Sequence, residues 1–286
     1  MNAIECRDLT KAYRGFTLDH LTFSLPAGCI LGLVGENGAG KSTTLKLLMN
    51  AISRDEGQVS LLGVDNQSPE FLQTKQDIGV VLDEACLPEV ITPRETGKLM
   101  ALTYTRWDQG LYEQYLARFA LPKDKKFKEL SRGMKMKLAI AAALSHGAKL
   151  LLLDEATSGL DPVVRDDILD LFLEFVQEED HAILVSSHIT SDLEKVADYI
   201  VFLHQGRVVF CKPKDELRYR YGVLRCGQAQ FADLDPADMV ACRRQDYEWE
   251  VLVADRDAAR RKYPKAVVDP ATMDEIMLLY VKGERR

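Results

Sequence analysis

Nine consecutive residues combine glycines, a lysine and two hydroxyl side chains in the order G-x-x-x-x-G-K-S-T. The glycines allow a tight backbone turn that aims successive N–H groups at phosphate oxygens. We expect Lys41 to contact the β- and γ-phosphates and the Ser42 hydroxyl to bind Mg²⁺. The pattern predicts a nucleoside triphosphate site made by Gly35, Glu36, Asn37, Gly38, Ala39, Gly40, Lys41, Ser42 and Thr43, here called the phosphate loop.

Two adjacent acids supply a second piece of chemistry. Asp154 and Glu155 follow the apolar run Leu150–Leu153, which is typical of a buried parallel strand. At the end of such a strand Asp154 can hold Mg²⁺ through its water shell, while Glu155 can reach an attacking water as general base. Asp161 and Pro162 follow closely and predict the cap and first residue of a helix. The combination favours nucleotide hydrolysis over two acids that merely cap a turn.

The sequence around the phosphate loop predicts the strand and the helix that position it. Ile30–Val34 is an apolar run of strand length directly before the phosphate loop. A helix is expected to follow from Thr43 through Met49. Strand, loop and helix therefore stand in the order that phosphate binding requires, with the positive end of the helix dipole at the phosphates.

Composition narrows the class of protein. The chain has 286 residues, enough for one sizeable domain with an appendage, and its net charge of −7 argues against nucleic-acid binding by general phosphate attraction. No apolar run reaches the length of a membrane span, and Met1–Asp8 shows no secretory signal, so a soluble intracellular chain is expected. The six cysteines lack metal-site spacing.

From Ile4 to Phe210 the chain resembles the nucleotide-binding subunit of ATP-binding cassette (ABC) transporters. Besides the two motifs above, Leu130-Ser131-Arg132-Gly133-Met134 occupies the place of the family's signature, ordinarily Leu-Ser-Gly-Gly-Gln. The helix Met134–Ser145 follows, so Ser131 is expected as its N-cap within an anion site. The resemblance implies that Ser131 and Gly133 bind the ATP of an opposite subunit, because two subunits pack head to tail.

The same resemblance assigns further residues. Tyr13 is similar to the aromatic residue that stacks on adenine, although a tyrosine near a strand is more often ordinary packing. His188 follows the apolar strand Ala182–Val185 and resembles the switch histidine that reaches the γ-phosphate. Ser158–Asp161 resembles the loop that couples the two sites of a dimer. The catalytic set implied is Glu155, His188 and Lys41, with ATP and Mg²⁺ as cofactors.

Two positions depart from the family pattern. Asp83 stands where the family has a glutamine that contacts Mg²⁺ and connects to the membrane partner. A carboxylate can still bind the metal, so the expected metal ligands are Ser42, Asp154 and Asp83, but a role toward the partner alone remains open for Asp83. In the signature, Arg132 and Met134 replace glycine and glutamine. Arg132 either adds a cation near the γ-phosphate or slows closure by its bulk.

The motifs also predict the organisation of the chain. We expect an α/β fold with a P-loop ATPase core, a mixed sheet with an antiparallel region, and a helical subdomain over about residues 69–146. Thr92–Trp107 and Leu111–Phe119 are its expected helices. The predicted ATPase domain covers residues 1–212. Residues 213–286 are expected to form a small α+β extension that braces a dimer, senses a ligand, or only packs.

The function predicted is that of an ATPase subunit that drives a separate membrane permease, more like an exporter than an importer. It is expected to work as a homodimer or a heterodimer, on the cytoplasmic face of the membrane, without nucleic acid. Cys86–Thr92 is the expected docking segment for the permease, by resemblance. A soluble ABC ATPase acting on ribosomes or DNA, or a regulatory ATP-binding protein, is the alternative.

Overall fold

The computed structural model describes residues 1–82 and 87–284. Contacts divide the chain into two compact units, Met1–Val208 and Val209–Arg286. The division falls within strand β10 (Arg207–Pro213), close to where the ATPase domain is predicted to end. Asp83 and Cys86 lie outside the described residues.

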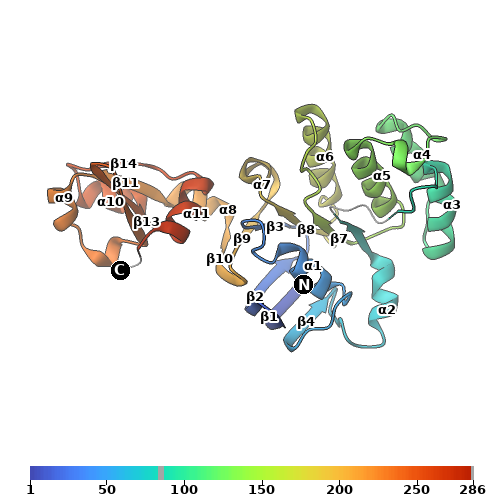
Figure 1. Ribbon diagram of the computed structural model, residues 1–286, viewed down its shortest axis with the longest axis horizontal. Coiled ribbons are helices and arrows are strands. Elements are labelled where there is room, and N and C mark those ends of the chain that lie inside the picture. The colour runs from blue at the N-terminus through green and yellow to red at the C-terminus, as the bar shows by residue number, and fades with distance from the viewer. Residues whose placement is uncertain (83–86, 285–286) are drawn as a thin grey trace. The chain divides into compact units, whose positions relative to one another are not determined.

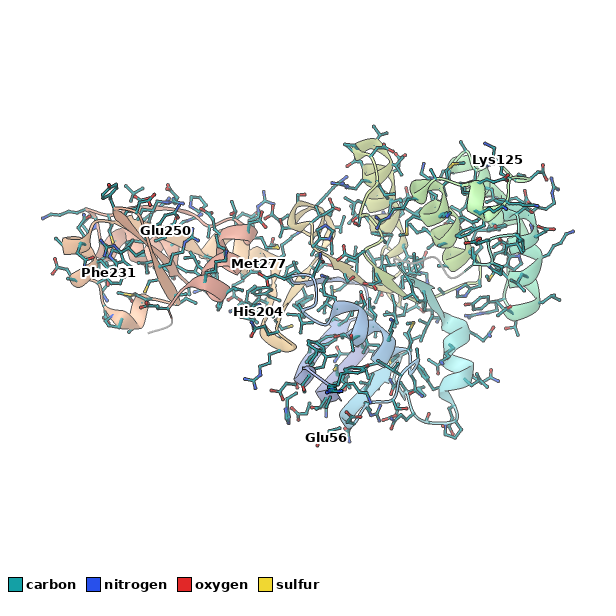
Figure 2. All side chains as sticks on the ribbon, in the orientation of Figure 1. Glu56, Lys125, His204, Phe231, Glu250 and Met277 are labelled. Atoms are coloured by element: carbon teal, nitrogen blue, oxygen red, sulfur yellow. The ribbon has the colours of Figure 1, made fainter. Side chains whose placement is uncertain are left out.

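One sheet of the first unit is antiparallel. Its order is β2-β1-β4-β5, and its strands are β1 (Asn2–Tyr13), β2 (Phe16–Pro26), β4 (Glu56–Leu61) and β5 (Val64–Asp65). Burial alternates along β2, where Leu21, Phe23 and Leu25 are buried and the residues between them are more exposed. This period of two is that of a strand with one covered face. Glu56, at the start of β4, points to solvent (Figure 2).

A six-stranded sheet carries the phosphate loop and the acidic strand. Its order is β10-β9-β3-β8-β7-β6, and the pairs β3–β8, β3–β9, β7–β8 and β6–β7 are parallel. Strands β3 (Ile30–Val34), β7 (Leu150–Asp154) and β8 (Ala182–Ser187) are buried along their whole length. Continuous apolar runs of this kind suit parallel strands covered on both faces. The other members are β6 (Ile78–Val81) and β9 (Tyr199–His204).

Helices cover this sheet and form a separate block (Figure 1). Helix α1 (Lys41–Leu48) follows the phosphate loop, and α6 (Pro162–Phe175) and α7 (Thr190–Val196) follow the acidic strand and β8. The green helices α3 (Pro93–Thr103), α4 (Gln109–Arg118) and α5 (Arg132–Leu144) lie side by side. Short helices α2 (Phe71–Thr74), η1 (Lys75–Asp77) and η2 (Phe127–Glu129) complete the region. The range 69–146 therefore also contains β6, which pairs with β7 in the sheet.

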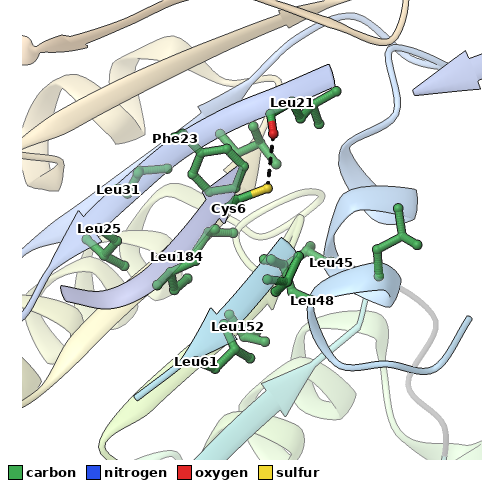
Figure 3. Packing of buried hydrophobic residues seen from close by; sticks show 14 of the residues in the cluster. Cys6, Leu21, Phe23, Leu25, Leu31, Leu45, Leu48, Leu61, Leu152 and Leu184 are labelled. Atoms are coloured by element: carbon green, nitrogen blue, oxygen red, sulfur yellow. Dashed lines mark hydrogen bonds between the residues drawn. The ribbon is translucent and has the colours of Figure 1, made fainter. Parts of the chain in front are cut away.

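The main core lies between the two sheets and α1 (Figure 3). Phe23 and Leu25 of β2 face this core together with Leu45 of α1, Leu152 of β7 and Leu184 of β8. Cys6 belongs to the same cluster and donates its thiol hydrogen to the Leu21 carbonyl oxygen at 3.3 Å. Burial raises the pKa of the Cys6 thiol to about 12, so this cysteine is an inert core residue.

The second unit is a small antiparallel sheet with helices. The sheet order is β12-β13-β11-β14. Phe231 and the sheet residues Leu224 and Val251 share a second hydrophobic cluster, and the opposite-facing Glu250 takes ion pairs from Arg225 and Arg243 (Figure 2). The elements are α8 (Lys214–Arg220), β11 (Gly222–Cys226), α9 (Gln228–Ala232), η3 (Pro236–Asp238), β12 (Ala241–Gln245), β13 (Glu248–Val253), α10 (Arg256–Lys262), β14 (Val267–Pro270) and α11 (Met273–Lys282).

None of the helices in residues 1–82 and 87–284 combines the length and the apolar character that a bilayer crossing requires.

Candidate active site and family

The phosphate loop joins β3 to α1, and its shape depends on glycine at several positions. Gly38 and Gly40 have φ angles of +84° and +111°, a region that favours glycine. Gly35 is required for another reason, because a Cβ there would lie 2.3 Å from the Leu203 carbonyl oxygen of β9. Gly40 stands directly before α1, so the helix N-terminus opens onto the loop. The local sequence thus builds an anion cradle.

Lys41 is the first residue of α1, and only 6% of its side chain is exposed. Its Nζ donates to the carbonyl oxygen of Gly35 at 2.8 Å and lies 3.3 Å from Oε1 of Glu155. A lysine bent over the loop in this way holds its charge inside the cradle. It therefore connects the phosphate loop to the end of the acidic strand.

Asp154 ends β7 and is buried, with 4% of its surface exposed. Its Oδ1 accepts a hydrogen bond of 2.6 Å from the hydroxyl of Ser186, which pairs with it across the parallel strands β7 and β8. Hydrogen bonds to ionised groups are among the stronger ones in proteins. Ser186 was not predicted as a site residue, because it meets Asp154 only through the pairing of β7 with β8 and no acid adjoins it in the sequence.

Glu155 and His188 form the polar wall of the site. Oε2 of Glu155 lies 2.6 Å from Nδ1 of His188, and the backbone N–H of Glu155 donates to the Ser186 carbonyl oxygen at 3.1 Å. Glu155 has a φ angle of +52°, which is unusual for a residue with a side chain. The turn directs its carboxylate toward both Lys41 and His188. A carboxylate with a histidine and a lysine beside it is suited to orient and deprotonate a water.

Lys41, Glu155 and His188 line a cleft of about 590 Å³. Phe16 and Ser158 line it as well, and neither was among the predicted binding residues. Tyr13 is not among the lining residues; it is 44% exposed, and the ammonium of Lys11 lies 5.8 Å from its ring centroid. Tyr13 pairs with Phe16 across the turn between β1 and β2. The full lining is Phe16, Glu36, Asn37, Gly38, Gly40, Lys41, Ser42, Thr43, Glu155, Ser158 and His188.

The signature residues lie away from this cleft. Ser131 caps α5, accepting a hydrogen bond from the Met134 N–H at 3.3 Å, as the sequence predicts. A Cβ on Gly133 would meet Leu160 at 3.4 Å, and a Cβ on Gly159 would meet Nη1 of Arg132 at 3.3 Å. The side chain of Arg132 therefore lies over the loop that follows the acidic strand.

The donor set fits a magnesium ion. Ser42 offers an exposed hydroxyl in the cleft, and Asp154 offers a buried carboxylate at the end of β7, directly before the cleft residue Glu155. Hydroxyl and carboxylate oxygens are the hard ligands that Mg²⁺ uses together with phosphate oxygens and water. Asp83, the third predicted ligand, lies outside the described residues.

Comparison with known proteins gives a consistent result. The family model described as "ABC transporter" matches residues 18–158. The chain is 28% identical to the ABC transporter ATP-binding protein YtrB of Bacillus subtilis, over 99% of each chain. It is 30% identical to the linearmycin resistance ATP-binding protein LnrL of Bacillus subtilis, over 96% of this chain and 92% of that one. The bacitracin transport ATP-binding protein BcrA of Bacillus licheniformis is 32% identical, over 76% and 72%.

Solved structures agree. An ATP-binding subunit of an ABC transporter matches with a TM-score of 0.68 and 28% identity, over 76% of this chain and 92% of that one. A dimeric ATP-binding cassette in a post-hydrolysis state, bound to ADP and Pi, has the same fold, with a TM-score of 0.66 and 23% identity over 74% and 98%. The phosphate loop, the acidic strand and these relatives together establish that the chain belongs to the ABC transporter family, as one of its ATP-binding and ATP-hydrolysing subunits.

Proposed function

We propose that this ATPase subunit powers a separate membrane permease and that the transport runs outward. The convergence of Lys41, Glu155 and His188 on one cleft carries the ATPase part of the proposal. The names of the relatives support the transport part, since they refer to bacitracin transport and linearmycin resistance. The chain would then act at the cytoplasmic face of the membrane.

We assign one role to each of the site residues. Lys41 and the N–H groups of the phosphate loop hold the phosphates of ATP, and Glu155 takes the proton of the attacking water while His188 fixes the carboxylate. Ser42 and Asp154 would hold Mg²⁺, whose charge neutralises the phosphate oxygens. Phe16 gives the cleft an aromatic side chain, and we propose it beside Tyr13 as a contact for the adenine.

We further propose that a second copy or a related subunit completes the site. Ser131 and Gly133 stand at the N-terminus of α5 and outside the cleft of their own chain. A helix N-terminus with a serine as its N-cap suits a phosphate group, and the second subunit's ATP would supply that phosphate. Two head-to-tail subunits would thus enclose two ATP molecules.

A trapped dimer tests this arrangement. Glu155→Gln retains shape but removes the base, so the variant is expected to bind ATP, to hydrolyse it very slowly, and to form a dimer in light scattering. Adding Ser131→Ala to Glu155→Gln is expected to abolish the dimer while ATP binding persists. Asp108→Ala, which removes the N-cap of α4 instead, is the matched control and is expected to leave the dimer intact. A dimer that survives Ser131→Ala would overturn the composite site.

Purification tests the transport role. The tagged full-length chain, extracted from membranes in mild detergent, is expected to carry a hydrophobic partner protein with it. Leu87–Thr92, the described part of the predicted docking segment, is the place to weaken that association. Recovery with ribosomes or DNA instead would favour a non-transport ATPase. Recovery alone, with only slow ATP turnover, would favour a regulatory protein.

A further inference from the structure

Arg165, near the start of α6, contacts two segments that belong to different sides of the active site. Its Nη2 donates to the carbonyl oxygen of Leu160 at 3.3 Å, in the loop between the acidic strand and α6. Its Nη1 lies 3.8 Å from Oδ1 of Asp192, in the first turn of α7. Helices α6 and α7 pack against each other (Figure 1). The guanidinium therefore joins the loop before α6 to the neighbouring helix.

Asp192 is a buried acid whose cationic partner is Arg165. It is 5% exposed, and its Oδ2 has no hydrogen-bond partner within residues 1–82 and 87–284. A buried carboxylate is costly unless a cation or hydrogen-bond donors compensate it. Buried ion pairs add little net stability, whereas the loss of one partner leaves an uncompensated charge. The pair therefore fixes the position of α7 relative to α6 more than it adds to the stability of the fold.

Each of the two contacts leads back to a catalytic residue over a short stretch of chain. The loop that ends at Leu160 begins at Glu155. Within this loop the Ser158 N–H donates to the Glu155 carbonyl oxygen at 3.0 Å, which makes a compact turn. Helix α7 begins two residues after His188, whose Nδ1 lies 2.6 Å from Oε2 of Glu155. Arg165 thus contacts both the turn that carries Glu155 and the helix that follows His188.

We propose that Arg165 is a positioning residue of the ATPase reaction, which holds the turn of Glu155 and the helix after His188 at the spacing that their contact requires. The proposal rests on the roles assigned above to Glu155 and His188. Arg165 is not among the described residues that line the nucleotide cleft, so it acts through these two residues. Misplacement of a reacting group by about 1 Å can lower a rate about a hundredfold. Loss of the guanidinium should therefore slow turnover without weakening the binding of ATP.

Steady-state hydrolysis of ATP by the full-length chain, in the presence of Mg²⁺, tests the proposal. Arg165→Ala is expected to lower kcat about tenfold and to leave the KM for ATP within about twofold, because the contacts in the cleft remain. Arg165→Lys retains a cation but loses the planar fork that reaches two partners, so it should recover only part of the loss. Asp192→Asn retains the shape of the side chain and the Leu160 contact, and it should lower kcat about threefold.

Lys195→Gln is the matched control. Lys195 also joins α7 to α6, through Asp166 at 2.6 Å and Asp170 at 2.9 Å, and not through the turn of Glu155. If Arg165 only held the two helices together, both substitutions would slow turnover alike. Lys195→Gln is instead expected to retain kcat within about twofold, because exposed ion pairs contribute little.

A double variant gives a readout that a merely structural role would not produce. In His188→Ala, the addition of Arg165→Ala should lower kcat at most about threefold further, because one of the two positioned residues is already gone. The proposal is overturned if Arg165→Ala retains kcat, if Lys195→Gln lowers kcat equally, or if the effects of His188→Ala and Arg165→Ala multiply in full.

Two further outcomes separate this inference from the proposed function. Rapid hydrolysis by Glu155→Gln would overturn the catalytic role of Glu155 and the inference together. Slow hydrolysis by Glu155→Gln with normal hydrolysis by Arg165→Ala would overturn the inference alone. If Arg165→Ala does not fold, Asp192→Asn decides the matter, because an unchanged kcat in that variant also overturns the proposal.

Discussion

Replacing Glu155 by glutamine is expected to tighten the binding of ADP. In the structure Nζ of Lys41 lies 3.3 Å from Oε1 of Glu155, and both side chains are largely buried. The lysine must exchange this carboxylate for the β-phosphate when a nucleotide enters. A neutral amide at position 155 competes less well for the lysine than a carboxylate does. ADP is the right probe because it reports on this exchange without the dimer that ATP is expected to form.

The size of the effect follows from the contact that is weakened. A hydrogen bond to a charged group contributes about 1.5–3 kcal/mol, and a neutral partner gives roughly half of that. Glutamine retains an oxygen that Lys41 can contact, so the competing interaction weakens by about 0.7–1.5 kcal/mol. Since 1.4 kcal/mol is tenfold in affinity, ADP should bind roughly three- to tenfold more tightly.

Isothermal titration of ADP in the presence of Mg²⁺ measures this difference. Glu179→Gln is the matched control, because it removes the same charge from an exposed position and should change the affinity little. Equal or weaker ADP binding in Glu155→Gln would refute the reasoning. An equal gain in Glu179→Gln would show that net charge, and not the contact with Lys41, sets the affinity.

The remaining predictions concern single residues. Lys41→Ala should weaken ATP binding and turnover together, and near-normal hydrolysis would contradict the phosphate-loop assignment. Gly35→Ala should cost about 1–3 kcal/mol in urea unfolding because its Cβ would overlap the Leu203 carbonyl; an unchanged midpoint would contradict this. Ser186→Ala should lower the free energy of urea unfolding by about 1.5–3 kcal/mol, because the Ser186 hydroxyl donates to a carboxylate. The control Ser187→Ala loses only a bond to the backbone and should lower it by about 1 kcal/mol, so equal losses would contradict the reasoning. Asp83→Ala should raise the Mg²⁺ concentration for half-maximal turnover, and Asp83→Gln should restore most of it; an unchanged titration favours a role toward the permease.

The sequence predicted the central strands and helix caps because these features depend mainly on residues close together in the chain. The apolar run Ile30–Val34 is a buried parallel strand, and Leu150–Leu153 is another that extends to Asp154. Asp161 and Ser131 cap helices as predicted, because a cap depends on a side chain and the backbone only three residues away. Helix α6 begins at Pro162, directly after its cap Asp161.

Features that depend on distant partners were harder to predict. Phe16 lines the cleft because the β1–β2 turn places it against Gly40, where a Cβ would meet its ring at 3.0 Å. Ser186 acquires its role only when β8 pairs with β7. Strands β11, β12 and β14 were missed, because short strands of a small sheet gain their stability from cross-strand pairing more than from local preference.

The left-handed backbone of Glu155 restricts which amino acids the fold accepts at that position. Two separate constraints act on residue 155. The backbone conformation at φ +52° is adopted most readily by glycine, asparagine or aspartate and disfavours valine and isoleucine. Proton transfer requires a carboxylate of suitable length. Glutamate supplies the carboxylate, although its side chain is strained in this backbone conformation. In a relative that no longer hydrolyses ATP, only the backbone constraint would remain at residue 155. We therefore expect asparagine, aspartate or glycine there rather than a branched residue.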